Sequence, residues 1–161
     1  MTFKLLSKAA LALAAMGLCL SAASAAYKSE YKLSVVPGAS SGWGQTATFF
    51  ADCVRQKSNG RINIKPYFGA QLMAGKQTSE LLLVRRGAID FALASTINWS
   101  PQIKELNLTA LPFFVANNPD RYKAIDAIEA GKSGKMLEKA IEKTGVKFLG
   151  WSENGFRELT T

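Results

Sequence analysis

The sequence predicts an α/β fold with a mainly parallel sheet flanked by helices. Three observations support this fold class. Short apolar segments with strand-like patterns recur along the chain, amphipathic segments with helical spacing separate them, and clusters of glycine, serine and proline mark the turns. When strands alternate with helices along a chain, the strands pair in parallel and the helices cover the faces of the sheet. The connections between such strands are right-handed crossovers.

Residues 1–25 are predicted to be a cleaved export signal. Lys4 and Lys8 precede an uncharged run over residues 9–20, and Ala23 and Ala25 form the A-x-A pattern that a signal peptidase accepts. The uncharged run is too short to span a bilayer, which needs ~20 apolar residues. We therefore expect residues 26–161 to form one exported domain that does not itself span the membrane.

The first two strands and the helix between them are predicted within residues 31–68. Residues 31–36 alternate in hydropathy and end in two valines, which is typical of a strand, and residues 37–42 have the composition of a loop. A helix follows and stops at residues 58–60, and residues 61–68 alternate as a second strand. The apolar face of this helix comprises Trp43, Ala47, Phe50, Ala51 and Val54.

The next predicted helix begins at Thr78 or Ser79 and closes at Gly87. Residues 88–94 are a continuous apolar run interrupted only by Asp90, which indicates a strand covered on both faces. Asp90 has no evident partner in the sequence. Ser95 and Thr96 follow the strand directly.

The last third of the chain is predicted to contain two helices and a final strand. Residues 97–117 are irregular, Asn118 is the expected cap of a helix whose first residue is Pro119, and residues 131–134 break that helix. A second helical face ends at residues 144–145, and residues 146–151 are predicted as the last strand. Met136, Leu137, Ala140 and Ile141 form that helical face.

Composition argues against several kinds of active site. The chain contains no histidine, so it cannot build a Ser-His-Asp triad, a Cys-His pair or a histidine metal site. Cys53 is the one cysteine beyond the export signal, so no internal disulfide forms after processing. Residues 69–76 resemble a phosphate-binding loop but have the wrong glycine spacing, and Gln77 replaces the required Ser or Thr. We expect no enzymatic activity, no cofactor and no metal.

The net charge of +8, or 8 − 2 = +6 without the two lysines of the signal, favours an anionic partner. Lysines and arginines are scattered along the sequence and few aromatic residues alternate with them, so nucleic acid is not an expected partner. The partners that remain compatible with the positive charge are small acidic solutes and anionic surfaces.

Parallel sheets bind ligands at the loops that follow the carboxyl ends of their strands. Here these loops are residues 37–42, 69–76, 95–99 and 152–157. Arg157 in the last loop has two readings: an ion pair with Glu153 or Glu158 at the surface, or a bidentate contact with a ligand carboxylate. The sequence around Arg157 does not decide between these two interpretations.

Several motifs together resemble the solute-binding subunits of TRAP transporters, the DctP-like family. In order they are NGRI followed by GAQL, then GAIDFA, LPF and GFR, between about Tyr31 and Thr161. The resemblance implies a type II-like periplasmic-binding-protein fold. Such a receptor closes two lobes around an organic anion, commonly a carboxylate or dicarboxylate, and delivers it to membrane permease subunits.

The resemblance also implies which residues line the ligand site. They are Arg157 and Asn154 in the last loop, Ser95 and Thr96 after the buried strand, and Val36 and Ser40 after the first strand. We expect Trp43, Trp99 and Phe113 to fill core instead of contacting ligand.

Family members are roughly twice as long, and their principal carboxylate-binding arginine lies in a downstream strand that this sequence lacks. The expectation is therefore a truncated N-terminal lobe, residues 26–161, whose second lobe is largely missing. A charge-assisted hydrogen bond contributes about 1.5–3 kcal/mol, whereas micromolar binding needs roughly 8 kcal/mol, so we expect this lobe alone to bind weakly. The alternative is a small exported α/β domain that binds a protein partner or an anionic surface.

Overall fold

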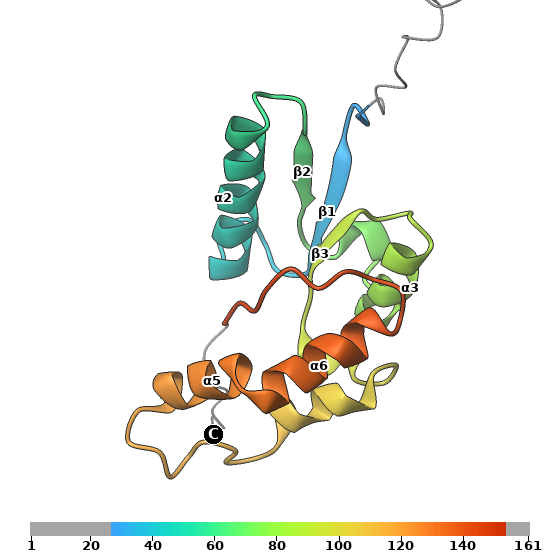
Figure 1. The fold of residues 1–161 in the computed structure, drawn as a ribbon. Coiled ribbons are helices and arrows are strands. Elements are labelled where there is room, and N and C mark those ends of the chain that lie inside the picture. The colour runs from blue at the N-terminus through green and yellow to red at the C-terminus, as the bar shows by residue number, and fades with distance from the viewer. Residues whose placement is uncertain (1–26, 154–161) are drawn as a thin grey trace, which may run out of the picture.

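The sheet at the centre of the structure has three parallel strands. The structure, a computed structural model, describes residues 27–153. Strands β1 (Tyr31–Val35), β2 (Ile64–Tyr67) and β3 (Phe91–Leu93) are arranged in the order β2-β1-β3. Leu33 of the central strand lies opposite Pro66 on one side and Phe91 on the other. Pro66 lacks an N–H group and is tolerated because β2 forms an edge of this sheet. The predicted α/β class with a parallel sheet is confirmed (Figure 1).

Helix α2 (Gly42–Lys57) covers one face of the sheet (Figure 1). The Ser41 side chain caps its first turn by accepting a hydrogen bond from the N–H of Gly44 at 3.1 Å. The helix ends where Asn59 and Gly60 adopt positive φ angles of 52° and 75°, as the predicted stop required. Its apolar side packs on the strands in what we call the α2 cluster. The buried members of this cluster are Leu33, Val35, Ala47, Ala51 and Ile64.

Several shorter elements lie away from α2 and build the second core of the molecule, against which Ala92 of β3 packs. These are the 3-10 turns η1 (Gln71–Met73) and η2 (Gln77–Ser79), helix α3 (Glu80–Arg85), helix α4 (Thr96–Trp99), the 3-10 helix η3 (Lys104–Ala110) and helix α6 (Lys132–Glu142). Gly87, with φ of 72°, ends the turn after α3 as predicted. We call the core on this side the α6 cluster. Its buried members are Leu81, Trp99, Ile103, Leu106, Leu137, Ala140 and Ile141.

Strand β3 has both faces packed, as its apolar sequence predicts. Phe91 and Leu93 contact the α2 cluster, and Ala92 contacts the α6 cluster. All three side chains are nevertheless only half-buried. The reason is that β3 forms an edge of the described sheet, so one side of the strand has no neighbouring strand.

Helix α5 (Arg121–Ala130) begins later than predicted. Its cap is Asp120, whose Oδ1 accepts a hydrogen bond from the N–H of Lys123 at 3.0 Å, and the expected cap Asn118 was wrong. The side chain of Asn118 instead accepts a hydrogen bond from the N–H of Asp120 at 3.1 Å. Asp120 therefore caps the helix, although Asn118 followed by Pro119 predicted a helix start two residues earlier.

The predicted break over residues 131–134 is reduced to Gly131, because α6 starts at Lys132. Gly134 lies buried inside α6, where a Cβ atom would stand 1.8 Å from the backbone oxygen of Glu129. A residue that looks like a helix breaker in the sequence is thus required for the close approach of α5 and α6. Leu137, Ala140 and Ile141 are buried as predicted, but Met136 is 48% exposed and does not belong to the core.

The predicted strand over residues 146–151 is wrong. The segment has no regular secondary structure, although its alternation is real: Val146, Phe148 and Trp151 pack on the α6 cluster, while Leu149 is exposed. Figure 1 shows this segment running back from the end of α6 below the carboxyl ends of the strands. A strand needs a hydrogen-bonded neighbour, and among residues 27–153 none pairs with this segment.

The three large aromatic residues predicted for the core behave differently. Trp99 is buried, at 8% exposure, and Trp43 packs half-buried against the α2 cluster. Phe113 is 87% exposed and has a φ of 58°, so its assignment to the core was wrong. Its neighbours Leu111 and Phe114 are also exposed. Residues 111–114 therefore present an apolar surface.

Candidate functional site

The loops after β1 and β2 are joined by backbone hydrogen bonds at the carboxyl edge of the sheet. The N–H of Gly69 donates to the carbonyl oxygen of Pro37 at 3.0 Å, and the N–H of Ala70 donates to that of Val35 at 3.4 Å. Ala70 is buried although its φ is 55°. The edge at which parallel sheets bind ligands is thus built from loops held in a fixed relation to each other.

The loop after β1 carries two predicted ligand residues. Val36 is half-buried, and Ser40 is exposed at the start of α2. The carbonyl oxygen of Ser40 accepts a hydrogen bond from Gln45 Nε2 at 3.3 Å. The loop packs closely on the helix, because a Cβ atom on Gly44 would lie 2.4 Å from the carbonyl oxygen of Ala39. Only glycine at position 44 allows this approach, which fixes the shape of the loop around Ser40.

Ser95 and Thr96 stand at the junction of β3 and α4. Both are half-buried, and the carbonyl oxygen of Ser95 accepts a hydrogen bond from the N–H of Trp99 at 3.2 Å. The hydroxyl oxygen of Thr96 accepts a hydrogen bond from Thr109 Oγ1 at 2.9 Å, which ties the junction to η3. Both hydroxyl groups follow the carboxyl end of a strand, as the sequence predicted.

The remaining predicted ligand residues, Asn154 and Arg157, lie outside the described residues. The segment that leads to them ends in Trp151, Ser152 and Glu153. Trp151 Nε1 is buried and finds no hydrogen-bond acceptor among residues 27–153. A buried indole N–H without an acceptor is unusual, so this position stands out next to the predicted ligand loop.

Glu80 is a buried carboxyl group that the sequence reasoning did not single out. Its side chain is completely buried, Ser34 Oγ donates to its Oε1 at 2.6 Å, and Trp99 Nε1 donates to its Oε2 at 3.1 Å. Burial raises the pKa of this carboxyl group, and the two hydrogen bonds only partly offset that effect. One signal was available: Ser34 interrupts an apolar strand at a position that faces away from Leu33 and Val35.

Asp90, which had no evident partner in the sequence, has two in the structure. Its Oδ2 accepts a hydrogen bond from the N–H of Lys32 at 2.9 Å, and its Oδ1 forms an ion pair with Lys28. Although desolvation raises the pKa of Asp90, its contacts with Lys28 and Lys32 outweigh that effect and lower it. Asp90 lies at the start of β3, whereas the predicted ligand residues follow the carboxyl ends of the strands, so its role is structural.

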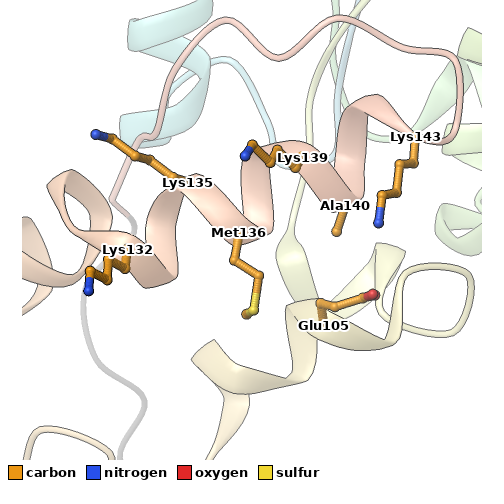
Figure 2. A pocket seen from close by; sticks show the side chains of 7 residues that line it. All are labelled: Glu105, Lys132, Lys135, Met136, Lys139, Ala140 and Lys143. Atoms are coloured by element: carbon orange, nitrogen blue, oxygen red, sulfur yellow. The ribbon is translucent and has the colours of Figure 1, made fainter.

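Some of the lysines that are scattered in the sequence gather in one place on the surface. Figure 2 shows four of them along one side of α6, with Glu105 of η3 across from the helix. They line a shallow groove of about 410 Å³. Lys135 and Lys139, and Lys139 and Lys143, are like charges four residues apart, a spacing that destabilises a helix slightly. The residues of the groove are Glu105, Lys132, Lys135, Met136, Lys139, Ala140 and Lys143.

A second groove of about 360 Å³ lies between α2 and β2. Neither groove is lined by Val36, Ser40, Ser95 or Thr96. Of the four described candidate residues, Val36, Ser95 and Thr96 are half-buried and Ser40 is exposed. Within residues 27–153 there is also no group of three His, Cys, Asp or Glu side chains that could hold a metal ion. In the same part of the chain no helix combines the length and hydropathy needed to cross a bilayer.

In open parallel sheets of this kind, ligands bind at the loops beyond the carboxyl ends of the strands. Residues 33–161 match the sequence profile of DctP, described as bacterial extracellular solute-binding protein, family 7. The chain belongs to this family.

Solved and curated relatives agree with this assignment. A TRAP periplasmic solute-binding protein from Ralstonia eutropha H16, solved with bound (S)-2-acetolactate, is 54% identical with a TM-score of 0.75, over 81% of this chain and 40% of that one. The C4-dicarboxylate-binding periplasmic protein DctP of Rhodobacter capsulatus is 26% identical over 91% of this chain and 42% of its own length. The 2,3-diketo-L-gulonate-binding periplasmic protein of Escherichia coli is 28% identical over 69% and 32%. The chain thus spans about a third to two fifths of these relatives.

Proposed function

We propose that this chain forms the N-terminal lobe of a periplasmic receptor that captures a small organic acid for a TRAP-type secondary transporter. The observation that carries this proposal is the 54% identity to a TRAP solute-binding protein with (S)-2-acetolactate bound. Family membership over residues 33–161 supports it. The described fold is consistent with it, because Val36, Ser40, Ser95 and Thr96 follow the carboxyl ends of strands in the sheet.

The proposed ligand is a small carboxylate. More distant relatives were solved with D-erythronate at 25% identity and with D-glucuronate at 26% identity, and these compounds share one carboxylate and several oxygen substituents with acetolactate. Because identity is much higher to the acetolactate-bound protein, a short branched acid of that kind is the first candidate for this chain.

In the proposed site, Arg157 holds the carboxylate through its planar guanidinium group. Asn154 donates from the same loop. Ser95 and Thr96 provide hydroxyl groups after β3, and the loop from Val36 to Ser40 closes the other side. The backbone bonds that join the β1 and β2 loops, and the bond between Trp99 and Ser95, support this assignment because they hold the edge in shape before a ligand arrives.

The proposal includes a second lobe, since the chain covers only 40% of its 54%-identical relative. Residues 26–161 then supply one wall of the ligand cleft. The exposed apolar residues Leu111, Phe113 and Phe114 support this view, because a soluble protein rarely leaves such side chains together without a partner surface. Residues 1–25 serve as the cleaved export signal, and membrane permease subunits receive the bound solute.

The reaction class in this proposal is binding without covalent chemistry. The alternative is a small exported domain that binds a protein partner or an anionic surface, and the four lysines along α6 are the observation in its favour (Figure 2). These lysines lie apart from the candidate ligand residues, so the two functions predict different responses to the same ligands.

Calorimetry separates the two functions. The protein, continued through its second lobe, is titrated with (S)-2-acetolactate, D-erythronate, D-glucuronate and succinate, and separately with vesicles containing anionic phospholipid. Micromolar binding of at least one acid without vesicle binding supports the receptor. Vesicle binding without any acid binding overturns it in favour of the alternative. Substitution of Lys135 and Lys139 by Gln is the matched control, because it removes two charges of the α6 groove and leaves the carboxyl edge intact.

A further inference from the structure

Glu80 is buried between the central strand and helix α4 without a charged partner. Its carboxylate oxygens accept hydrogen bonds from Ser34 Oγ at 2.6 Å and Trp99 Nε1 at 3.1 Å. Among residues 27–153 no lysine or arginine forms an ion pair with it. The carboxyl group therefore links two neutral donors that come from different elements.

Packing alone does not account for a glutamate at this position. Burying a carboxyl group without a cation is unfavourable, and a leucine of similar size would fill the same space in the α6 cluster without that penalty. A carboxyl group differs from a leucine in one relevant respect. It can hold two donors at once, one on each oxygen.

Both donors are directly connected to candidate ligand residues. Ser34 stands two residues before Val36 in the chain, and Ser34 is itself paired with Ala92 of β3. Trp99 donates its backbone N–H to the carbonyl oxygen of Ser95 at 3.2 Å. A continuous series of contacts thus runs from the loop after β1, through Glu80, to the junction after β3.

We propose that Glu80 is a positioning residue for the ligand site: by holding Ser34 and Trp99 together, it sets the position of Ser95 and Thr96 relative to the loop that begins at Val36. This inference rests on the proposed function. It adds that the geometry of the binding edge depends on a buried residue that does not touch the ligand.

The opposing interpretation is that Glu80 only stabilises the lobe. Under that interpretation, substitutions at Glu80 change the melting temperature but leave the affinity of the folded protein unchanged. Under the positioning proposal, affinity changes at a temperature where every variant is folded. The two interpretations therefore differ in whether affinity follows hydrogen bonding at Glu80 or overall stability.

The test measures binding of (S)-2-acetolactate by calorimetry to the protein continued through its second lobe, with folding of each variant verified by circular dichroism. Glu80→Leu can bond to neither partner, and we expect its affinity to fall about tenfold, as for the loss of two hydrogen bonds. Glu80→Gln keeps an acceptor for Trp99 Nε1 and an amide that can donate to Ser34 Oγ. We expect its affinity to stay within about twofold of the wild type, since both links are retained.

Ile141→Val is the control for stability, because it trims the same buried cluster at a residue that takes part in neither hydrogen bond. It should lower the melting temperature and leave affinity unchanged. If Glu80→Leu does not fold, Ser34→Ala and Trp99→Phe remove one link each and are expected to weaken binding by about threefold, each losing a single hydrogen bond.

Tryptophan emission shows directly whether the link between Glu80 and Trp99 is broken in each variant, so that any change in affinity can be compared with loss of the link. In a Trp43→Phe, Trp151→Phe background Trp99 is the only tryptophan left of three. Its emission should shift to shorter wavelength with Glu80→Leu, which removes the acceptor of the indole N–H, and stay unchanged with Glu80→Gln.

Two results would overturn the inference while leaving the proposed function intact: wild-type affinity in folded Glu80→Leu, or equal losses in Glu80→Leu and Glu80→Gln. Failure of the wild-type protein to bind any acid of the panel is a different outcome. It removes the proposed function, and the positioning role with it.

Discussion

The carboxylate of Asp90, at the start of β3, accepts a hydrogen bond from the backbone N–H of Lys32 in β1 at 2.9 Å. The N–H of Asp90 in turn donates to the carbonyl oxygen of Lys32 at 3.1 Å. These two residues extend the pairing of the strands by one step beyond the three residue pairs of the ladder. The ion pair with Lys28 adds a third contact to the same carboxylate.

We expect Asp90→Asn to lower the free energy of unfolding by about 1 kcal/mol at neutral pH, because it weakens a charge-assisted hydrogen bond whose second partner, Lys28, is exposed. The pKa of Asp90 is lowered below its ordinary value of 3.8 in the folded state. Its contribution is therefore present above that value and is lost as the pH falls through the lower, folded pKa. Urea denaturation at pH 7 and at pH 3 measures both effects.

The control for this variant is Asp52→Asn, which breaks an exposed ion pair with Arg55 on α2. Surface pairs contribute about 0–1 kcal/mol, so this change should cost less than Asp90→Asn. An equal loss in the two variants, or a difference from wild type that grows at acid pH, would contradict the role given to Asp90.

Glu80→Gln should raise the melting temperature at pH 7 to 8. Burial raises the pKa of Glu80 above its ordinary value of 4.5, so the folded state holds a proton over a pH range in which the unfolded state has released it. Stability attributable to this group consequently falls as the pH rises between the two pKa values. The melting temperatures of wild type and Glu80→Gln should converge below pH 4.5. Parallel curves across the whole pH range would show that Glu80 does not titrate in this way.

Ala74→Gly should stabilise the protein by about 0.5–1 kcal/mol. Ala74 is exposed and has a φ of 48°, a left-handed conformation that costs a residue with a Cβ atom roughly 1–2 kcal/mol. The greater flexibility of glycine in the unfolded chain offsets part of the gain. Thermal denaturation checks this prediction. Ala88→Gly, an exposed alanine without positive φ, serves as the comparison and should not stabilise the protein.

Arg157→Lys should weaken binding of (S)-2-acetolactate by about tenfold in the protein continued through its second lobe, because a lysine loses the fork that engages both carboxylate oxygens. Isothermal calorimetry measures the change. Arg55→Lys, at an exposed position on α2, is the matched control and should bind like wild type. Unchanged affinity in Arg157→Lys would assign Arg157 to the surface.

Residues 26–161 alone should bind (S)-2-acetolactate with a dissociation constant in the millimolar range or weaker. One arginine contributes about 1.5–3 kcal/mol, whereas micromolar binding requires roughly 8 kcal/mol. Calorimetry of this segment beside the protein continued through its second lobe compares the two directly. Micromolar affinity in the shorter protein would show that one lobe suffices.

Local patterns predicted the fold well where the governing interactions are themselves local. The strands at β1 and β2, helix α2 and the stop at Gly87 follow from alternation, helical spacing and glycine, all of which act within a few residues. The error at residues 146–151 has a different origin. Alternation shows which side chains are buried, but only a neighbouring strand turns an extended segment into part of a sheet.

The candidate site was less accessible from the sequence. Ser95 and Thr96 were predicted because they follow a strand, which is a rule of chain order, and their contact with a ligand stays a prediction. Glu80 was missed because its role depends on Ser34 and Trp99, which are 46 and 19 residues away and meet it only in three dimensions. The lysines on α6 are a different case, since their spacing of three and four residues was present in the sequence of a predicted helix, but the lysines were treated as scattered charges.

The strand order β2-β1-β3 has a consequence for how the molecule acquires its shape. The strand that is synthesised first occupies the middle, and both of its neighbours come later in the chain, the second of them ending at Leu93. The described sheet therefore cannot be completed until residue 93 has left the ribosome, so β1 lacks one of its neighbours until all of residues 36–93 have been made. Since contacts between distant residues slow folding, this topology keeps the nascent polypeptide open for longer than a hairpin would.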